Sequence, residues 1–255
     1  MMLICFGTRP EWIKIKPVVD VIRNDIPYKL LFTGQHLDIL DSIDEEVTRL
    51  EVSDGANRLD SIVQSMMNQE EIFEGITSIF VQGDTSSVFA MALAAFHRGI
   101  KIIHLEAGLR TYNKSHPYPE EFNRRAVSCM ADIHFCPTQK AMDALHAENI
   151  FENVYLVGNT VLDNLSGIET EYGDEVIITL HRRENHDSMA VWFETLDRIA
   201  SNYPEYTFTI PLHPNPRVKK HAHLLKHVNV VDPIPYKKFI RRLAKSKLVI
   251  TDSGG

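Results

Sequence analysis

The chain has 255 residues, of which 44% are hydrophobic and 24% are charged, and its formal net charge at pH 7 is −7. This composition excludes a disordered or fibrous protein and fits one large or two modest globular domains. The negative charge provides no general attraction to nucleic acid or to an anionic membrane surface, so we expect neither as a partner.

The first half of the chain alternates short apolar runs with amphipathic stretches of helical spacing. We expect strands at residues 3–6, 29–32, 79–81, 100–105, 133–136 and 154–157. We expect helices at residues 10–23, 38–50, 59–74, 86–96, 121–130 and 140–148. Such alternation is typical of parallel βαβ units, so it predicts an α/β protein in which residues 1–165 form a Rossmann-like domain.

The sequence becomes polar after residue 157, where Gly167 and Gly173 indicate a linker. Beyond it we expect strands at residues 176–179, 207–210, 228–231 and 248–251, with helices at 190–201 and 236–244. The terminal TDSGG reads as a strand followed by the glycine turn that opens a helix in nucleotide-binding domains. Residues 166–255 therefore predict a second nucleotide-binding, Rossmann-like domain that is incomplete.

Cysteine usage and the apolar runs bear on where the protein works. Cys5, Cys129 and Cys136 lie in apolar stretches without a CxxC pair, which favours small buried residues over a metal site. No apolar run reaches the roughly 18 residues of a membrane span, and the apolar start of the chain lacks a basic leader. We expect a protein of the reducing cytoplasm with no metal.

The turn after the first strand, GTRPE at residues 7–11, leads directly into a predicted helix. The N-terminus of a helix exposes unpaired N–H groups and carries partial positive charge, so Arg9 beside it makes a phosphate site. An ordinary strand-to-helix turn explains this feature equally well.

Two acidic residues follow predicted strands, at the edge where an open parallel sheet places its active site. Asp84 comes after VQG, and Glu106 comes after HL. A carboxyl group that is partly removed from water there has a raised pKa, which suits it to proton transfer near neutral pH. The alternative for Asp84 is a helix N-cap.

Glu120 and Glu121 stand at a predicted helix start, where acidic residues commonly serve the helix dipole. Arg110, in EAGLRT at residues 106–111, could pair with them or with a phosphate, as could the two arginines that end PEEFNRR. In the second half, His181 and His213 again follow predicted strands, and we expect them to bind phosphate or sugar, not zinc.

The order of these motifs is more specific than any one of them. They are FGTRPEWIK at 6–14, TGQH at 33–36, QGDT at 82–85, HLEAGLRT at 104–111, PEEFNRR at 119–125, GNTVLD at 158–163, HRREN at 181–185, HPNP at 213–216 and the terminal TDSGG. Over the whole chain this order closely resembles the non-hydrolysing UDP-N-acetylglucosamine 2-epimerase family.

The resemblance implies two Rossmann-like domains that face each other across a cleft, the GT-B architecture. It also implies the interconversion of UDP-N-acetylglucosamine and UDP-N-acetylmannosamine without NAD, metal or another cofactor. UDP leaves C1 as the C2 proton is removed, and both groups then add back to the glycal intermediate. Such a path requires carboxylates around C2 and cations that stabilise the departing pyrophosphate.

Residue by residue, the resemblance implies a catalytic group and a set of substrate-binding positions. Matching the catalytic residues of the family are Asp84, Glu106, Glu120 and His181. We expect the UDP-sugar substrate to be bound by Arg9, Lys14, Arg110, His213, Ser253 and Gly254.

The sequence departs from the family at several positions. Gln35 and His36 match a pair that binds an allosteric UDP-N-acetylglucosamine, yet Ser65 stands where that regulatory site has an arginine, and Trp12 replaces a small residue. Family members also continue past DSGG. We therefore expect either a truncated chain or one completed by a C-terminal polypeptide, and by resemblance a homodimer.

Three alternatives stay open at this point. A hydrolysing relative would use the same carboxylates and release N-acetylmannosamine and UDP. A binding remnant without turnover is favoured by the missing segment and by Ser65. A glycosyltransferase shares the architecture but lacks the pairing of EAGLRT with PEEFNRR.

Overall fold

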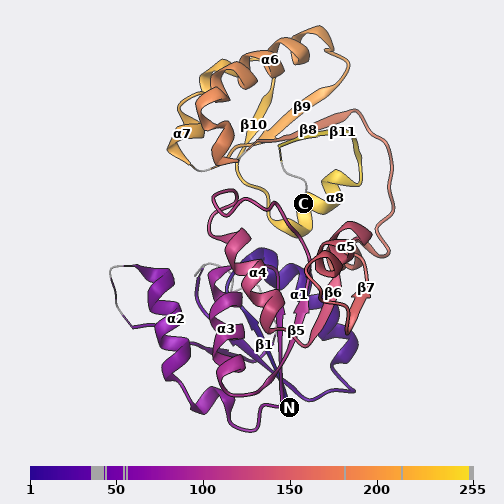
Figure 1. Ribbon diagram of the computed structural model, residues 1–255. Coiled ribbons are helices and arrows are strands. Elements are labelled where there is room, and N and C mark those ends of the chain that lie inside the picture. Colours follow the sequence, from indigo (N-terminus) through magenta and orange to yellow (C-terminus); the bar gives the residue numbers. More distant parts are fainter. Residues whose placement is uncertain are drawn as a thin grey trace. The chain divides into compact units, whose positions relative to one another are not determined.

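The computed structural model divides the chain into two compact units, Met1–Asn164 and Leu165–Gly255. It describes all residues except 36–42, 44, 54, 56, 181, 214 and 253–255. Figure 1 shows both units. The boundary between the units lies next to the one expected from the sequence, after residue 165.

The first unit is built on a parallel sheet of seven strands in the order β3-β2-β1-β4-β5-β6-β7. The strands are β1 (Met2–Phe6), β2 (Tyr28–Phe32), β3 (Val47–Arg49), β4 (Ser78–Gln82), β5 (Lys101–Leu105), β6 (Ile133–Cys136) and β7 (Val154–Leu156). From β1 the chain adds β2 and β3 on one side, then returns to add β4 to β7 on the other. This reversal is the topological switch point at which open α/β sheets bind their ligands.

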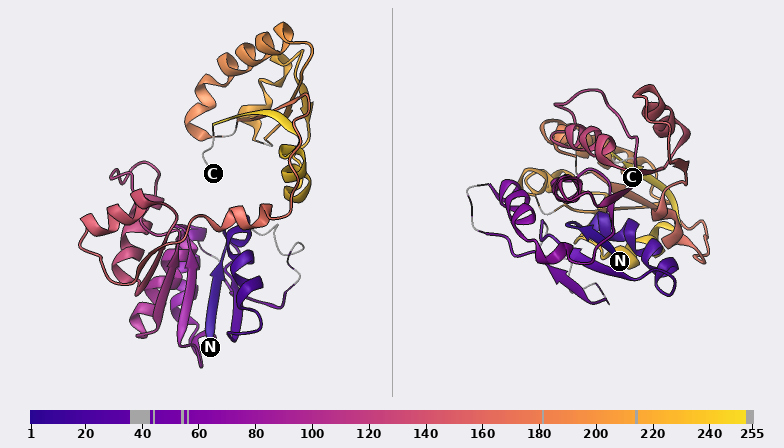
Figure 2. Two further views of the ribbon diagram at one scale, coloured as in Figure 1. Left: turned by 90° about the vertical axis from the view of Figure 1, so that its right-hand side faces the viewer. Right: turned by 60° about the horizontal axis from the view of Figure 1, so that its bottom comes forward.

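Helices cover both faces of this sheet, as the edge-on view in Figure 2 shows. On one face α1 (Arg9–Ile22) packs Trp12 and Ile15 against Phe6 and Phe32. The opposite face carries α2 (Arg58–Asn68), α3 (Ser86–His97) and α4 (Glu120–Met130), whose apolar side chains share one cluster with Leu3, Cys5 and other strand residues. A smaller cluster is formed around α5 (Gln139–Ala147).

Side-chain caps fix the starts of α1 and α3 beside the carboxyl edge. Thr8 accepts a hydrogen bond from the Glu11 amide, while the Glu11 carboxylate accepts from the amides of Gly7 and Thr8 at 2.7 and 2.6 Å. This reciprocal arrangement satisfies donors that a helix start leaves unpaired. Thr85 caps α3 by accepting from the Val88 amide, so the cap proposed as the alternative role of Asp84 is wrong.

The second unit has a parallel sheet of four strands in the order β10-β9-β8-β11 among its described residues. They are β8 (Glu175–Thr179), β9 (Thr207–Pro211), β10 (Asn229–Val231) and β11 (Ser246–Thr251). Helix α6 (Met189–Asn202) packs Phe193 and Leu196 on this sheet, and α7 (Pro216–Lys219) adds Val218. Helix α8 (Tyr236–Leu243) is tied to β8 by the ion pair of Arg242 with Glu175 at 2.5 Å.

The predicted α/β class and its parallel strands are confirmed, but the helix expected over residues 59–74 ends at Asn68, and the short helix α7 was not predicted. The helix expected over residues 38–50 is wrong at its end, because Val47–Arg49 forms strand β3 and pairs with β2. Two of the three residues of β3 are exposed, so this strand has no apolar run to reveal it. In the described part of the chain, no helix combines the length and apolarity needed to cross a membrane.

Candidate active site

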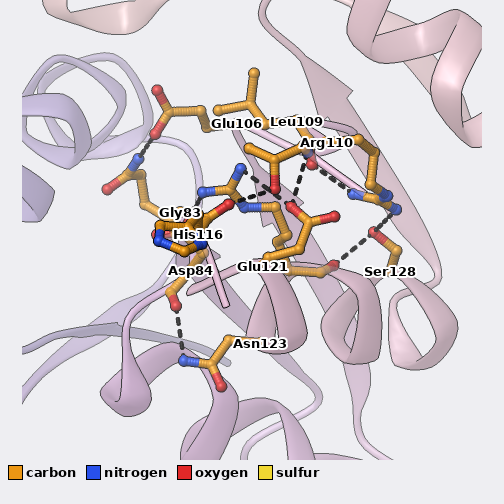
Figure 3. Close-up of polar contacts among 12 residues, drawn as sticks. Gly83, Asp84, Glu106, Leu109, Arg110, His116, Glu121, Asn123 and Ser128 are labelled. Atoms are coloured by element: carbon orange, nitrogen blue, oxygen red, sulfur yellow. Dashed lines mark hydrogen bonds and ion pairs between the residues drawn. The ribbon is translucent and has the colours of Figure 1, made fainter. Parts of the chain in front are cut away.

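Three carboxylates approach one another at the carboxyl edge of the first sheet. Asp84 follows β4, Glu106 follows β5 and Glu120 opens α4. Figure 3 shows the polar contacts around the first two. Gly83 and Glu106 have positive φ values of 79° and 65°, so both strands end in abrupt turns. This conformation is strained for a non-glycine residue such as Glu106, and strain of this kind gathers at functional sites.

Glu106 is held from two sides. Lys14 of α1 donates to both of its carboxylate oxygens at 2.7 Å, and the Gln82 side chain donates to Oε2. The Lys14 and Glu106 side chains are only 23% and 15% exposed, so this ion pair is poorly screened by water. The contact joins the helix after β1 to the end of β5 across the switch point.

Opposing influences act on the carboxyl group of Asp84. Arg124 of α4 donates to its carboxylate, and the side-chain amide of Asn123 donates to its main-chain oxygen at 2.9 Å. Burial raises the pKa of Asp84, the Arg124 charge and hydrogen bond oppose that effect, and the Glu106 and Glu120 carboxylates raise it further. The net result is a raised pKa, which moves this carboxyl toward the range useful for proton transfer.

The adjacent glutamates of α4 have different surroundings. Oε2 of Glu120 is buried and finds no hydrogen-bond donor among the described residues. Glu121 is fully buried and accepts from the amides of Thr111 and Tyr112 at 2.9 Å each. Burial alone would raise the pKa of Glu121, but these hydrogen bonds outweigh it and the net pKa is lowered. Glu121 therefore holds the loop before α4, and Glu120 is the one with an unsatisfied oxygen.

A small pocket adjoins Lys14 and Glu106. It is also lined by Gln82, Leu105, Pro137 and the Gly158–Thr160 start of the GNTVLD motif. Thr160 donates to the Lys14 main-chain oxygen at 2.6 Å, and Asn164 donates to that of Ile13 at 2.8 Å. The motif after β7 thus closes onto α1 and forms one wall of this pocket.

The two predicted substrate-binding arginines have different surroundings. Arg9 is the exposed first residue of α1, beside the carboxyl edge of β1. The Arg110 side chain is 1% exposed and donates to both Glu148 oxygens at 2.8 and 2.7 Å and to Ser128 at 3.0 Å. These contacts, of which the one with Ser128 is drawn in Figure 3, favour a structural role for Arg110 over the predicted contact with a substrate.

In the second unit, the ends of β8 and β11 are joined by Asp252. Its Oδ2 accepts from the Arg182 amide and from the Asn185 side chain, both at 2.9 Å. His213 is exposed after β9, and its Nδ1 accepts from the Asn215 amide at 3.2 Å. The predicted site residues His181, Ser253 and Gly254 lie outside the described residues.

The predicted allosteric pair is described only in part. The Gln35 side chain accepts from the Ser87 hydroxyl at 2.8 Å, whereas His36 lies outside the described residues. Ser65 is buried and accepts from the Ser53 amide at 3.1 Å. Trp12 is 6% exposed and packs on Phe6 with the ring centroids 4.9 Å apart. Both residues therefore stabilise the first unit, Ser65 through a hydrogen bond and Trp12 through packing.

Comparison with known proteins bears on what this arrangement does. A family model described as UDP-N-acetylglucosamine 2-epimerase matches residues 21–255. The chain is 35% identical to a protein of that name from Campylobacter jejuni, aligning over all of this chain and 76% of the relative. This chain therefore belongs to the UDP-N-acetylglucosamine 2-epimerase family. Members of this family are isomerases.

Solved structures of 2-epimerases share the fold. One from Neisseria meningitidis, bound to UDP-GlcNAc, has a TM-score of 0.85 and 33% identity over 99% of this chain and 78% of its own. One from Listeria monocytogenes has a TM-score of 0.87 and 32% identity over 99% of this chain and 74% of its own. The predicted fold class, α/β with Rossmann-like units of the GT-B type, is confirmed.

Several residues of the site were not assigned to it by sequence reasoning. Gln82 lies within a quoted motif, but nothing in the sequence shows that it contacts Glu106 from the neighbouring strand. Asn123, which fixes the main chain of Asp84, also had no sequence signal of its own. The described residues contain no group of three or more His, Cys, Asp or Glu side chains arranged to hold a metal ion.

Proposed function

We propose that this chain interconverts UDP-N-acetylglucosamine and UDP-N-acetylmannosamine by elimination and re-addition of UDP. The observation that carries the proposal is the meeting of Asp84, Glu106 and Glu120 at the carboxyl edge of the first sheet, with the pKa of Asp84 raised. The bound UDP-GlcNAc named for the Neisseria relative supports a UDP-sugar as the substrate.

The chemistry requires two bonds to break together and two to form. The C2–H proton moves to a protein base while the C1–O bond to UDP breaks, which leaves a glycal and UDP. After the intermediate rotates, UDP adds to C1 and a protein acid returns a proton to the other face of C2. A protein group accepts one proton from C2 during elimination, and the same group or its partner donates one proton to C2 during re-addition. The protons therefore balance over the two half-reactions.

The carboxyl groups differ in ways that fit these roles. Asp84 is suited to donate or accept near neutral pH because its pKa is raised. Oε2 of Glu120 has no described donor, so it is available to a substrate. Glu106 already accepts from Lys14 and Gln82, and it positions the Lys14 ammonium at the pocket as a cation for the departing pyrophosphate.

Further expectations rest on the family alone. We infer that Arg9 contributes to phosphate binding in the first unit, and that His181, His213, Ser253 and Gly254 bind the nucleotide in the second. A cytoplasmic homodimer that supplies polysaccharide biosynthesis, and completion by a C-terminal polypeptide, are proposals of the same kind. Sedimentation velocity with and without a family-type C-terminal polypeptide tests both assembly proposals.

The reaction is tested directly by incubating the chain with UDP-N-acetylglucosamine in deuterated water and following the sugar by NMR. We expect deuterium at C2 together with UDP-N-acetylmannosamine. Free N-acetylmannosamine with UDP would instead identify a hydrolysing enzyme. Absence of C2 exchange by folded protein would contradict the proposal and favour a binding remnant.

A further inference from the structure

His104 is a buried histidine that the proposed chemistry does not use. It lies on β5, two residues before Glu106, and its side chain is excluded from solvent. Its Nε2 lies 2.8 Å from the main-chain oxygen of Gly83, at the end of the neighbouring strand β4. Because a carbonyl oxygen only accepts, Nε2 carries the proton and donates this bond.

The surroundings hold His104 in this one tautomer. Burial, followed by the nearby His134, Arg110 and Arg124, lowers the pKa of His104 to about 4, against the opposing effect of the Gly83 bond. The imidazole is therefore neutral at physiological pH. Nδ1 has no hydrogen-bond partner in the described part of the chain, so a proton there would be buried without an acceptor.

The Gly83 bond belongs to a set that fixes the main chain on both sides of Asp84. The Gly83 amide donates to the Leu105 oxygen at 3.0 Å, and the Asn123 side chain donates to the Asp84 oxygen at 2.9 Å. Gly83 has a φ of 79°, a turn that glycine adopts readily and that needs such support to stay in one conformation. His104 supplies the bond to the peptide that joins Gly83 to Asp84.

We propose that His104 is a positioning residue for the proton transfer: by donating to the Gly83 oxygen it sets where the Asp84 carboxyl lies. This inference rests on the proposed function. Small displacements of a reacting group lower the rate steeply, so losing this bond lowers kcat. Substrate binding does not involve His104, and KM stays close to its original value.

His134 provides a matched control. It pairs with His104 in the register of β5 and β6 and is 1% exposed, and burial is the main cause of its lowered pKa. Its Nδ1, too, has no hydrogen-bond partner among the described residues. Its hydrogen bond goes to the main chain of Ala131 and not to the carboxylate group. Replacing either histidine by leucine therefore removes a similar buried bond, but only one replacement loosens Gly83.

The experiment compares His104→Leu, His104→Gln, His134→Leu and the unmodified chain, each confirmed as folded by circular dichroism. The Gln variant keeps an N–H donor near the position of Nε2. We expect His104→Leu to lower kcat by about tenfold to a hundredfold with KM within about twofold. We expect His104→Gln to recover most of that loss and His134→Leu to keep normal kcat. Equal losses for both leucine variants, or unchanged kcat in His104→Leu, would overturn the proposal.

A second readout separates this inference from the proposed reaction. Hydrogen exchange at the Gly83 amide and the carbon-13 titration of the Asp84 carboxyl are measured in the same proteins without substrate. Faster Gly83 exchange and an altered Asp84 titration in His104→Leu alone support the positioning role even if the unmodified chain turns over no UDP-sugar. No difference between the His104→Leu and His134→Leu proteins would refute it.

Discussion

Asp84 has the most finely balanced environment of the described carboxylates. Its pKa is raised mainly by burial, and Arg124 counteracts part of that effect. An exposed aspartate would give up its proton too readily to act as an acid near neutral pH. The raised pKa of Asp84 brings this carboxyl closer to the range in which it can donate a proton. The adjacent cation prevents a still larger shift, so Asp84 can exist in both protonation states.

The first prediction concerns this carboxyl. Asp84→Asn keeps the size of the side chain but cannot transfer a proton, so we expect the epimerisation rate to fall by about 10²- to 10⁴-fold. The rate is measured by NMR with UDP-N-acetylglucosamine as substrate. Asp143→Asn, an exposed aspartate of α5, is the control and leaves the rate unchanged. A rate near normal in Asp84→Asn would remove Asp84 from the mechanism.

The second prediction concerns Arg110 and its partner Glu148. Breaking a buried ion pair leaves an uncompensated charge, so Arg110→Met lowers the free energy of unfolding by about 3 kcal/mol or more. Glu148→Gln weakens the same pair from the other side and lowers it by a smaller amount. Urea denaturation of both variants and of the double variant measures the coupling between the two side chains.

The same variants decide between the two roles of Arg110. If the pair is structural, both single variants keep a normal KM for UDP-N-acetylglucosamine at temperatures where they are folded. If Arg110 instead contacts the substrate, Arg110→Met raises KM and Glu148→Gln does not.

At the scale of elements, the turn after β1 and the turn after β4 share one carboxylate. Glu11 accepts from the amides of Gly7 and Thr8 with one oxygen and from the Thr85 hydroxyl with the other. It thereby links the start of α1 to the start of α3 on the opposite face of the sheet. Burial raises the pKa of Glu11 despite these bonds, since the side chain is 2% exposed.

The third prediction follows from this shared cap. In Glu11→Gln one oxygen becomes an NH₂ group that faces a donor, so we expect the free energy of unfolding to fall by about 1–3 kcal/mol. Guanidinium denaturation provides the measurement. Glu71→Gln, an exposed glutamate outside the caps, is the control and changes stability little. Equal stability of the two variants would contradict the linking role of Glu11.

The elements were largely predictable because most strands of the first sheet are buried apolar runs. Both ends of strand β6 (Ile133–Cys136) match the prediction, and α3 ends one residue later than predicted. Short exposed strands such as β3 carry no such signal. The α7 helix, Pro216–Lys219, was not predicted because one turn is too short to show a period.

The site was predictable only in its outline. A position directly after a buried strand identifies Asp84 and Glu106, because parallel strands end at one edge. Which side chains pair there depends on the tertiary structure. The adjacent glutamates at the start of α4 look alike in the sequence, yet only Glu121 holds the preceding loop. Likewise the partner of Arg110 is 38 residues away, at the end of α5.

At the scale of the whole molecule, each unit contains one of the chain's two tryptophans. Trp12 is buried in the first unit, and Trp192 is 44% exposed in the second. In Trp192→Phe the fluorescence reports the first unit alone. That unit also contains His104, so its response to acid can be followed without interference.

The fourth prediction concerns that response. The pKa of His104 is about 4 in the folded chain and about 6.5 when unfolded, so the unfolded state binds more protons between these values. The contribution of His104 to the free energy of unfolding is fully present above pH 6.5. It is lost as the pH falls toward 4, and the total loss is about 3 kcal/mol. The lowered pKa of His134 also decreases stability as the pH falls, whereas the raised pKa of Asp84 has the opposite effect.

Denaturation of Trp192→Phe at several pH values between 7 and 4, with and without His104→Gln, measures this effect. We expect the added replacement to flatten the dependence of the free energy of unfolding on pH. Parallel curves for the two proteins would show that His104 does not titrate on unfolding in this range.

The ion pair of Lys14 with Glu106 joins residues that are 92 positions apart in the chain. It can form only after β1, β4 and β5 have aligned, which places it among the last contacts to be made as the polypeptide acquires its shape. Long-range pairings of this kind fold slowly because the intervening loop must first be closed. On dilution from denaturant, catalytic competence should therefore return with the slowest phase of refolding, after helical circular dichroism has already recovered.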